Sequence, residues 1–349
     1  MANDPIRDAV QLIGDNQPND YALKPTGHPQ YFKSQPETSV LCDILTSSKV
    51  ASLARQYDEK DSDAAGAQKD FKRTFDLSNV MVLTTSLLIS ATLAVSIVFP
   101  GNQPALLVVS VASLISGAVA AIFLNILRQG DLLDGWLTER ARAELMRSEY
   151  FLEVASTDVP DDPDHRPDLL RLEYFRRYQL GIQRNFYHGR SREHSRQSRR
   201  ALTISSISIA LASLVTALSG TALSGFAHGK FTALAAFGAA FTAFGSFATL
   251  RENVYQNQRN AERYKKTAET LTGMESTLDE VRKAVREAGQ LPLLEFVKAV
   301  QSQLSLEHQQ WLELKDPQNK AIDELKANLD EATRKAGEKK KAAAASETP

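Results

Sequence analysis

The chain has 349 residues, with 41 lysines and arginines against 42 aspartates and glutamates, and a net charge of −1. This balance gives no general reason to bind nucleic acid or acidic substrates. The single cysteine, Cys42, has no partner for an intramolecular disulfide or for the usual zinc spacings, which excludes a disulfide-stapled fold. Charge is unevenly distributed, because residues 77–127 contain no Asp, Glu, Lys or Arg and residues 201–250 contain only Lys230. Such a distribution is typical of a membrane protein.

The N-terminal residues 1–36 are rich in Pro, Asn and Gly, which predicts an irregular segment. A helix is expected from about Glu37, with a break near the sequence DEKDSDAAG (58–66) before it resumes toward the first uncharged stretch.

Four uncharged stretches are long enough to cross a bilayer. Residues 79–99 would form a helix about 31 Å long, which matches the hydrocarbon core. The short turn PGNQP separates them from a second span at 105–127, and a similar turn separates spans at 201–223 and 231–250. The alternative, buried helices of a soluble all-α protein, is disfavoured because uncharged runs near 50 residues rarely serve that purpose. We therefore expect an all-α membrane protein with two transmembrane helical hairpins and long cytoplasmic helices continuing from the spans.

Lysines and arginines near the span ends predict the orientation. Sixteen of them flank the outer limits of the two hairpins, whereas the two turns carry only Lys230. The positive-inside rule therefore places both termini and the connector 128–200 in the cytoplasm. A multi-pass protein of the cell inner (plasma) membrane is expected.

A basic, aromatic-rich helix is expected from Leu169 to Arg200, leading into the third span. It interleaves Arg171, Arg176 and Arg177 with Tyr174, Phe175 and Tyr178. This pattern fits phosphate binding, of lipid headgroups or of a nucleotide, and it also fits positive-inside anchoring with helix packing. The candidate membrane-interface or phosphate-binding residues are Arg184, Arg190, Arg192, Arg196, Arg199, Arg200 and Arg251.

One segment outside the spans is expected to lack a site. Residues 157–168 (TDVPDDPDHRPD) contain three prolines and predict a solvated linker. Their acidic residues and histidine could be imagined as metal ligands, but no partner cluster accompanies them. The residues concerned are Asp161, Asp162, Asp164 and His165.

The region after the fourth span predicts further cytoplasmic helices over 291–336, followed by a disordered tail at 337–349. One apolar face is formed by Leu293, Val297, Val300 and Leu304. A second short face, which is too brief to establish a coiled coil, is formed by Ile322, Leu325, Leu329, Ala332 and Ala336.

Residues 37–156 and 169–290 share one order of elements: a charged helix, a hairpin, and a charged exit helix. The entry helix RNFYHGRSREHSRQSRR, the tight hairpin and the exit helix RARAELMRSEYF resemble the SLATT family, the two-transmembrane effector domains of nucleotide-signalled prokaryotic conflict systems. The segment FVKAVQSQLSLEHQQWL looks like the helix that closes such units. The resemblance implies a role in membrane perturbation or pore formation, here as two tandem units.

Enzymatic and transport motifs are absent from the sequence, so we expect no catalytic residue, metal or cofactor. No span contains an acidic residue, Arg or His, which disfavours proton-coupled transport. Small residues instead predict close helix packing or a pore wall. These candidates are Ser113, Gly117, Ser206, Ser213, Gly220, Gly238 and Gly245. In the fourth span a Phe stripe is expected on another face, formed by Phe237, Phe241 and Phe244.

Spans and resemblance together predict an effector that oligomerises and permeabilises or depolarises the inner membrane, triggered through its cytoplasmic helices. The expected partners are the lipid bilayer, further copies of the chain, and a cytoplasmic sensor protein or nucleotide signal, without nucleic acid. A non-conducting scaffold that recruits a cytoplasmic partner and a housekeeping ion channel remain alternatives.

Overall fold

The computed structural model describes residues 4–33, 36–99, 101–160, 162–220, 230–312, 319–327, 329–330 and 334. Every regular element in these ranges is a helix, so the all-α expectation is confirmed for them. The chain divides into two compact units. Unit 1 comprises Met1–Gln68, Asp134–His194 and Arg259–Glu313, and unit 2 comprises Lys69–Leu133, Ser195–Gln258 and Leu314–Pro349.

The N-terminal part of unit 1 is helical, and the irregular segment expected over 1–36 is corrected. Its elements are α1 (Pro5–Ile13), η1 (Pro18–Ala22), η2 (Pro25–Gly27), α2 (His28–Phe32), η3 (Pro36–Thr38) and α3 (Ser39–Thr46). Prolines lie in the first turn of α1, η1, η2 and α2. A helix loses nothing there, because the missing N–H would have had no intrahelical partner. The prolines that suggested irregular structure therefore begin these helices.

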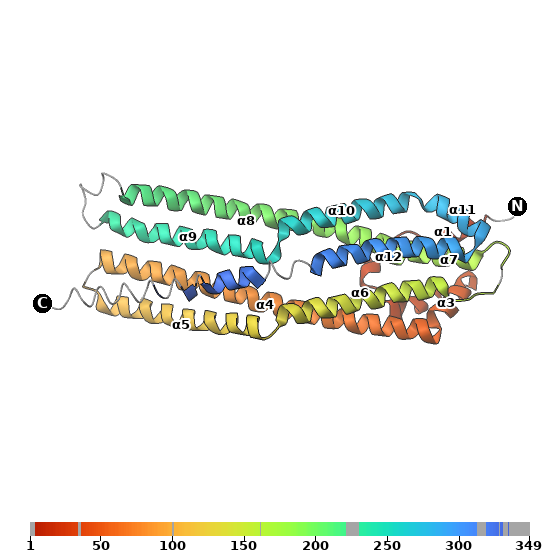
Figure 1. Cartoon of the computed structure of the whole chain (residues 1–349), viewed down its shortest axis with the longest axis horizontal. Helices are drawn as coiled ribbons and strands as arrows, with labels where there is room; N and C mark the ends of the chain where they lie inside the picture. Colours follow the sequence, from red (N-terminus) through yellow and green to blue (C-terminus); the bar gives the residue numbers. More distant parts are fainter. Residues whose placement is uncertain are drawn as a thin grey trace. The chain divides into compact units, whose positions relative to one another are not determined.

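The core of unit 1 surrounds α7 (Arg166–Phe175), in which every residue from Pro167 to Phe175 is buried. α7 contacts α1, α3, α11 (Leu278–Ala288) and α12 (Gln290–Leu312). It continues through a π-helical turn, η4 (Arg176–Gly181), into α8 (Ile182–Gly220). The unit also contains most of α6 (Leu132–Ser156) and of α10 (Asn257–Ser276), which Figure 1 labels.

Arg171 of α7 closes the C-terminal end of α6. Its side chain is 1% exposed, and Nη1 donates to the carbonyl oxygens of Ala155 at 2.9 Å and Thr157 at 2.6 Å. Its other terminal nitrogen is hydrogen-bonded to Asp168. A charged donor at the last carbonyls of a helix is favoured by the helix dipole. The described residues between α6 and α7 form no helix, but α7 already begins at Arg166, so the last three residues of the solvated linker expected over 157–168 are helical and two of them, Pro167 and Asp168, are buried.

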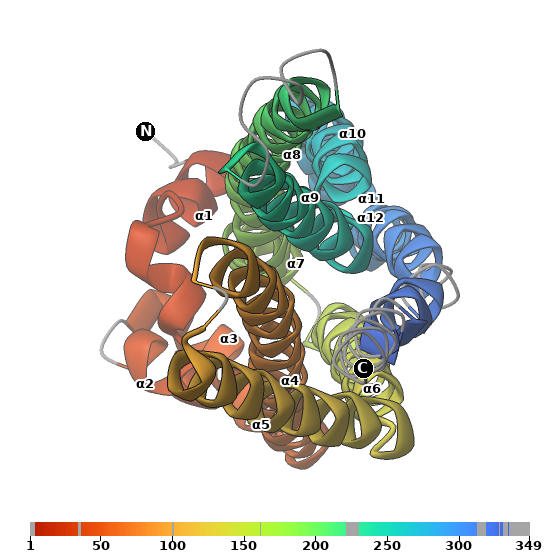
Figure 2. The ribbon, with the colours of Figure 1, turned by 90° about the vertical axis from the view of Figure 1, so that its left-hand side faces the viewer.

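Unit 2 contains the apolar parts of α4 (Ser48–Val98) and α8, together with α5 (Gln103–Gln129) and α9 (Lys230–Tyr255). Figures 1 and 2 show α4 beside α5 and α8 beside α9. A further helical segment, residues 319–327 with 329–330, belongs to the same unit. The break expected near residues 58–66 is wrong: α4 is continuous there, and Ala64 is only 2% exposed, so packing outweighs the weak helix propensity of Gly66.

Three helical stretches are long and apolar enough to cross a membrane: Ser48–Val98, Gln103–Ser156 and Arg166–Ser219. They contain the spans expected at 79–99 and 105–127 and most of the span at 201–223. The span expected at 231–250 lies in α9, which is not among the three, and the side chains of 231–235 are not described. The second turn, residues 221–223 and the tail 337–349 lie outside the described residues. Four spans in two hairpins therefore remain a prediction.

Both helices that leave the apolar region are interrupted by one residue with a positive φ. Asp131 (φ 43°) separates α5 from α6, and Gln256 (φ 47°) separates α9 from α10. The second break is held by Glu252, whose carboxylate accepts from the Asn257 amide at 2.9 Å and from the Gln258 backbone N–H at 2.8 Å. The continuous exit helices implied by the sequence are thus corrected at these positions.

Candidate functional site

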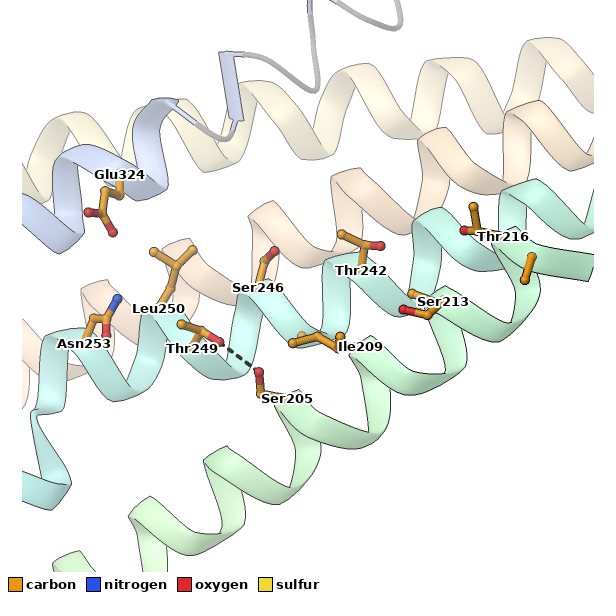
Figure 3. A pocket seen from close by; sticks show the side chains of 13 residues that line it. Ser205, Ile209, Ser213, Thr216, Thr242, Ser246, Thr249, Leu250, Asn253 and Glu324 are labelled. Carbon is orange, nitrogen blue, oxygen red and sulfur yellow. Dashed lines mark hydrogen bonds between the residues drawn. The ribbon is translucent and has the colours of Figure 1, made fainter. Parts of the chain in front are cut away.

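A cleft of about 790 Å³ runs along α8 and α9 in unit 2 (Figure 3). Its walls combine hydroxyl groups with small and apolar side chains, and none of its lining residues is basic. The hydroxyl-bearing residues are Ser205, Ser213, Thr216, Thr242, Ser246 and Thr249. Ser205 and Thr249 are hydrogen-bonded across the two helices at 3.1 Å. The membrane-length helix α8 and its neighbour α9 thus carry a polar wall here, and Glu324 is the one charged side chain among the lining residues that the structure describes.

Gly238 and Gly245, the glycines of the fourth expected span, face α8. A Cβ added at Gly245 would lie 3.4 Å from Cβ of Ser208, and one at Gly238 would lie 3.4 Å from Oγ1 of Thr216. Both glycines are buried, and Gly245 also lines the cleft. Small residues at such positions let two backbones approach closely in lipid.

The Phe stripe of α9 points differently from its glycines. Phe237 is 56% exposed and Phe244 is 41% exposed, whereas Phe241 is intermediate. The two faces that the sequence separated are therefore separate in the structure, with the glycines against α8 and two of the three phenylalanines outward.

The α4–α5 pair is joined by polar contacts close to the predicted residues. Thr85 donates a hydrogen bond to Ser116 at 3.0 Å, and Ser116 donates to the carbonyl oxygen of Met81 at 3.2 Å. A Cβ added at Gly117 would lie 3.6 Å from Thr85, and Ser113 is partly buried on the same helix. Ser116, which the sequence did not single out, makes the interhelical bond; its i+3 spacing from Ser113 was the available signal.

The remaining small-residue candidates lie on α8. Ser213 is exposed and lines the cleft, whereas Ser206 is exposed and does not line it. Gly220 is the last residue of α8.

The predicted arginines divide into paired and unpaired groups. Arg184 forms an ion pair with Glu275, Arg190 with Glu193 at 2.6 Å, and Arg251 with Asp76 at 3.6 Å. The others are exposed and have no side-chain partner among the described residues: Arg192, Arg196, Arg199 and Arg200. These four keep both sequence interpretations, anchoring and phosphate binding, open.

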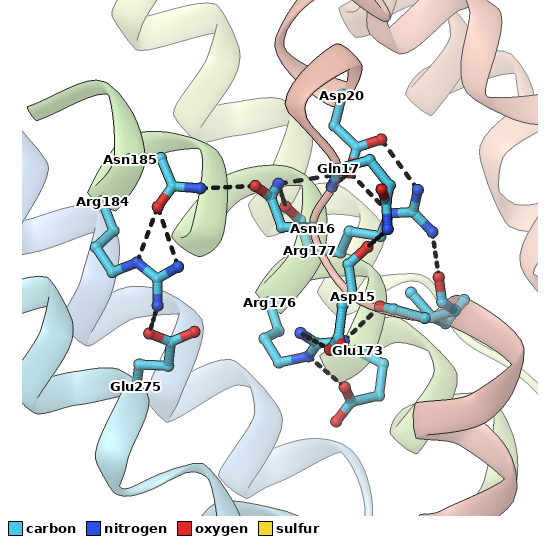
Figure 4. Close-up of polar contacts among 12 residues, drawn as sticks. Asp15, Asn16, Gln17, Asp20, Glu173, Arg176, Arg177, Arg184, Asn185 and Glu275 are labelled. Atoms are coloured by element: carbon cyan, nitrogen blue, oxygen red, sulfur yellow. Dashed lines mark hydrogen bonds and ion pairs between the residues drawn. The ribbon is translucent and has the colours of Figure 1, made fainter. Parts of the chain in front are cut away.

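Arg171, Arg176 and Arg177, by contrast, are buried, which favours helix packing over phosphate binding for these three residues (Figure 4 shows the last two). Arg177 donates to both carboxylate oxygens of Asp20, at 2.8 Å and 3.0 Å. Arg176 donates to Glu173 at 2.5 Å and to the carbonyl oxygen of Gly14 at 2.6 Å. Buried charges persist only when they are paired and hydrogen-bonded, and here the pairs hold the N-terminal helices onto α7 and η4.

A second buried polar cluster in unit 1 joins α8, α10 and α12. Tyr187 donates to Glu307 at 2.8 Å, and Arg263 lies 3.3 Å from the other carboxylate oxygen. Burial raises the pKa of the Glu307 carboxyl above its usual range, and it also raises the pKa of the Tyr187 hydroxyl. Glu307 could not be singled out from sequence alone, because its partners Tyr187 and Arg263 are far away along the chain.

His28 lies at the centre of unit 1. Its Nδ1 is 2.5 Å from the Tyr174 hydroxyl, which is in turn 2.6 Å from the Tyr150 hydroxyl. Burial lowers the pKa of His28 to about 4, so the imidazole is neutral at physiological pH.

Among the described residues no group of three or more His, Cys, Asp or Glu side chains could hold a metal ion. In the linker, His165 has a φ of 49° and its Nδ1 lies 3.6 Å from the carboxylate of Asp168. Asp162 and Asp164 lie in the turn before it, where Asp162 accepts from the Asp164 backbone N–H at 2.9 Å. Asp161 is outside the described residues.

Comparison with known families gives one match. Residues 175–311 match the family described as SMODS and SLOG-associating 2TM effector domain 1. The matched segment holds η4, Tyr187, Glu307 and every cleft-lining residue except Glu324, and it supports the SLATT resemblance over these residues. It does not include α4 and α5, so the second, tandem unit stays a prediction. Searches of curated proteins and of solved structures found no match.

Proposed function

We propose that this chain is a membrane-embedded effector of a prokaryotic defence or conflict system, which oligomerises and permeabilises or depolarises the inner membrane. The observation that carries the proposal is the hydroxyl-lined cleft, because its hydroxyl groups lie on the membrane-length helix α8 and on α9, inside the segment that matches a two-transmembrane effector family. The proposed role is non-enzymatic and needs no cofactor.

The cleft has a length suited to conduction. From Ser205 to Thr216 an α-helix rises about 17 Å, which is more than half of a hydrocarbon core about 30 Å thick. Polar groups at this depth are costly in contact with lipid and are tolerated where they bond to one another or face water. A cleft that opens along its side conducts only when something completes its wall, and further copies of the chain would do so.

The orientation and signal follow from charge and from unit 1. The positive-inside rule supports a cytoplasmic location for both termini and for unit 1. The proposed trigger is a sensor protein or a nucleotide signal that acts on the cytoplasmic helices. Buried ion pairs there, such as Arg177 with Asp20, could switch between two bonded states when the signal binds. A tandem pair of helix-hairpin-helix units is supported by the matching breaks at Asp131 and Gln256.

Leakage from vesicles tests this function. Purified protein in liposomes with an entrapped dye should release it when a nucleotide or sensor is supplied, and induced cells should lose membrane potential and stop growing. A chain whose expected spans are replaced by unrelated apolar hairpins should do neither. If the replaced chain retains full activity, the scaffold alternative is correct, and if the wild-type chain conducts without harming cells, it is a housekeeping channel.

A further inference from the structure

The helical segment formed by residues 319–327 with 329–330, called here the C-terminal helix, has one buried and one charged face. Four apolar side chains are 0–5% exposed: Ala321, Ile322, Leu325 and Leu329. Its charged side chains are exposed, namely Lys320, Asp323, Glu324 and Lys326. A face buried at this level is packed as tightly as a protein core, so the helix is seated on unit 2 in a defined orientation.

The seat lies at the arginine-rich ends of the apolar helices. Asp323 is 3.7 Å from Nε of Arg128, one residue before the end of α5. Glu324 lines the cleft beside Leu250 and Asn253 of α9, as Figure 3 shows. The C-terminal helix therefore occupies the end of the hydroxyl-lined cleft that the positive-inside rule assigns to the cytoplasm.

The contacts that hold the C-terminal helix on unit 2 are weak enough to form and break reversibly. The ion pair with Arg128 joins side chains that are 59% and 57% exposed, and such surface pairs contribute little. A segment of about twelve residues does not form a stable helix alone in water, so it depends on its buried apolar face. Residues 313–318 connect it directly to α12, whose Glu307 belongs to the buried polar cluster of unit 1.

We propose that the C-terminal helix is an inhibitory plug, which closes the cytoplasmic end of the cleft until the trigger withdraws it. This inference rests on the proposed function, because it names the element that regulates the same cleft. The resting chain is then held closed by its own segment, and the activating signal only has to weaken the seat of that segment.

Basal leakage from liposomes without any trigger tests the plug. Leu325→Asp places a charge in the fully buried seat, and Lys326→Asp makes the same change at the neighbouring exposed position. Ending the chain after Glu313 removes the helix, and ending it after Ala336 keeps it. We expect Leu325→Asp and the shorter chain to leak at least about tenfold faster than wild type. The two controls should leak at the wild-type rate.

A thiol-cleavable cross-link provides a second, reversible measurement. Because Cys42 is the only native cysteine, Cys42→Ala with Arg128→Cys and Asp323→Cys creates a single defined pair for a thiol-cleavable bis-maleimide. Adding Leu325→Asp to this chain should give vesicles that are tight when cross-linked and leak once the link is reduced. Retained helix content by circular dichroism identifies variants that fold.

The outcomes separate the plug from the proposed function. If triggered wild-type protein leaks but Leu325→Asp and the shorter chain do not exceed its basal rate, the plug is wrong and the effector stands. Equal leakage of the cross-linked and the reduced chain also overturns the plug. If no variant leaks and cells keep their membrane potential under every condition, both proposals fall.

Discussion

Replacing Gly245 by leucine should separate α8 from α9. A Cβ at this position would already lie 3.4 Å from Ser208 and 3.8 Å from Ile209, so alanine just fits and the remaining three carbons of leucine do not. Overpacking of this kind costs about 1–3 kcal/mol. Gly273 of α10 is the matched control, because nothing lies within 4 Å of its added Cβ. Gly273→Leu should stabilise its helix by about 0.5–1 kcal/mol, because glycine loses more conformational freedom in a helix than other residues do.

Thermal unfolding of the detergent-solubilised protein gives the stability change, and disulfide trapping reports the helix contact directly. Ser205→Cys with Thr249→Cys in a Cys42→Ala chain should cross-link readily, since the two hydroxyls are 3.1 Å apart. Adding Gly245→Leu should lower the unfolding temperature and slow the cross-linking, whereas Gly245→Ala should do neither. If Gly245→Leu blocks leakage while stability and cross-linking stay at wild-type values, Gly245 faces an oligomeric lumen and the packing argument is refuted.

Three further changes test unit 1 and the cleft. The folded state holds His28 neutral, with a pKa of about 4 against 6.5 in the unfolded chain. The free energy of unfolding is therefore highest above pH 6.5 and falls by up to about 3 kcal/mol as the pH drops toward 4. His28→Gln should flatten this part of a curve of denaturation stability against pH. Arg177→Met should cost about 3–5 kcal/mol because it strands the buried Asp20 carboxylate, and adding Asp20→Leu should recover part of the loss in a double-mutant cycle of chemical denaturation. Thr242→Val should slow triggered leakage severalfold at unchanged melting temperature, and an unchanged rate would remove this hydroxyl from the conducting wall.

Local properties of the chain were predictable. An uncharged run of 21 residues predicts a membrane-length helix because length and charge alone decide it, and the glycine and phenylalanine faces of α9 follow from helical spacing. The N-terminal helices are not predictable from proline content, because a proline that breaks a helix and one that begins it, as Pro5 and Pro18 do, look alike in composition.

Pairings between distant residues were not predictable. Arg177 meets Asp20, which is 157 residues away, so its charge looked like part of a surface patch. Gln256 breaks its helix without a glycine or proline beside it, so no local signature marks that break, whereas Gly130, the C-cap of α5, was an available signal for the break at Asp131. The apolar spacing of Ile322, Leu325 and Leu329 was visible, but spacing alone does not say where a helix docks.

The interruptions at Asp131 and Gln256 make the four long helices mechanically unequal. An unbroken hydrogen-bond ladder carries torsion along a helix, and α4 and α8 have such a ladder over 51 and 39 residues. In α5 and α9 a twist applied beyond the break is absorbed by one left-handed residue. A rotation is therefore expected to be transmitted along α4 and α8 but not across the breaks that end α5 and α9. One residue inserted into α4 would rotate everything beyond it by about 100°, whereas one inserted beside Asp131 would be taken up locally.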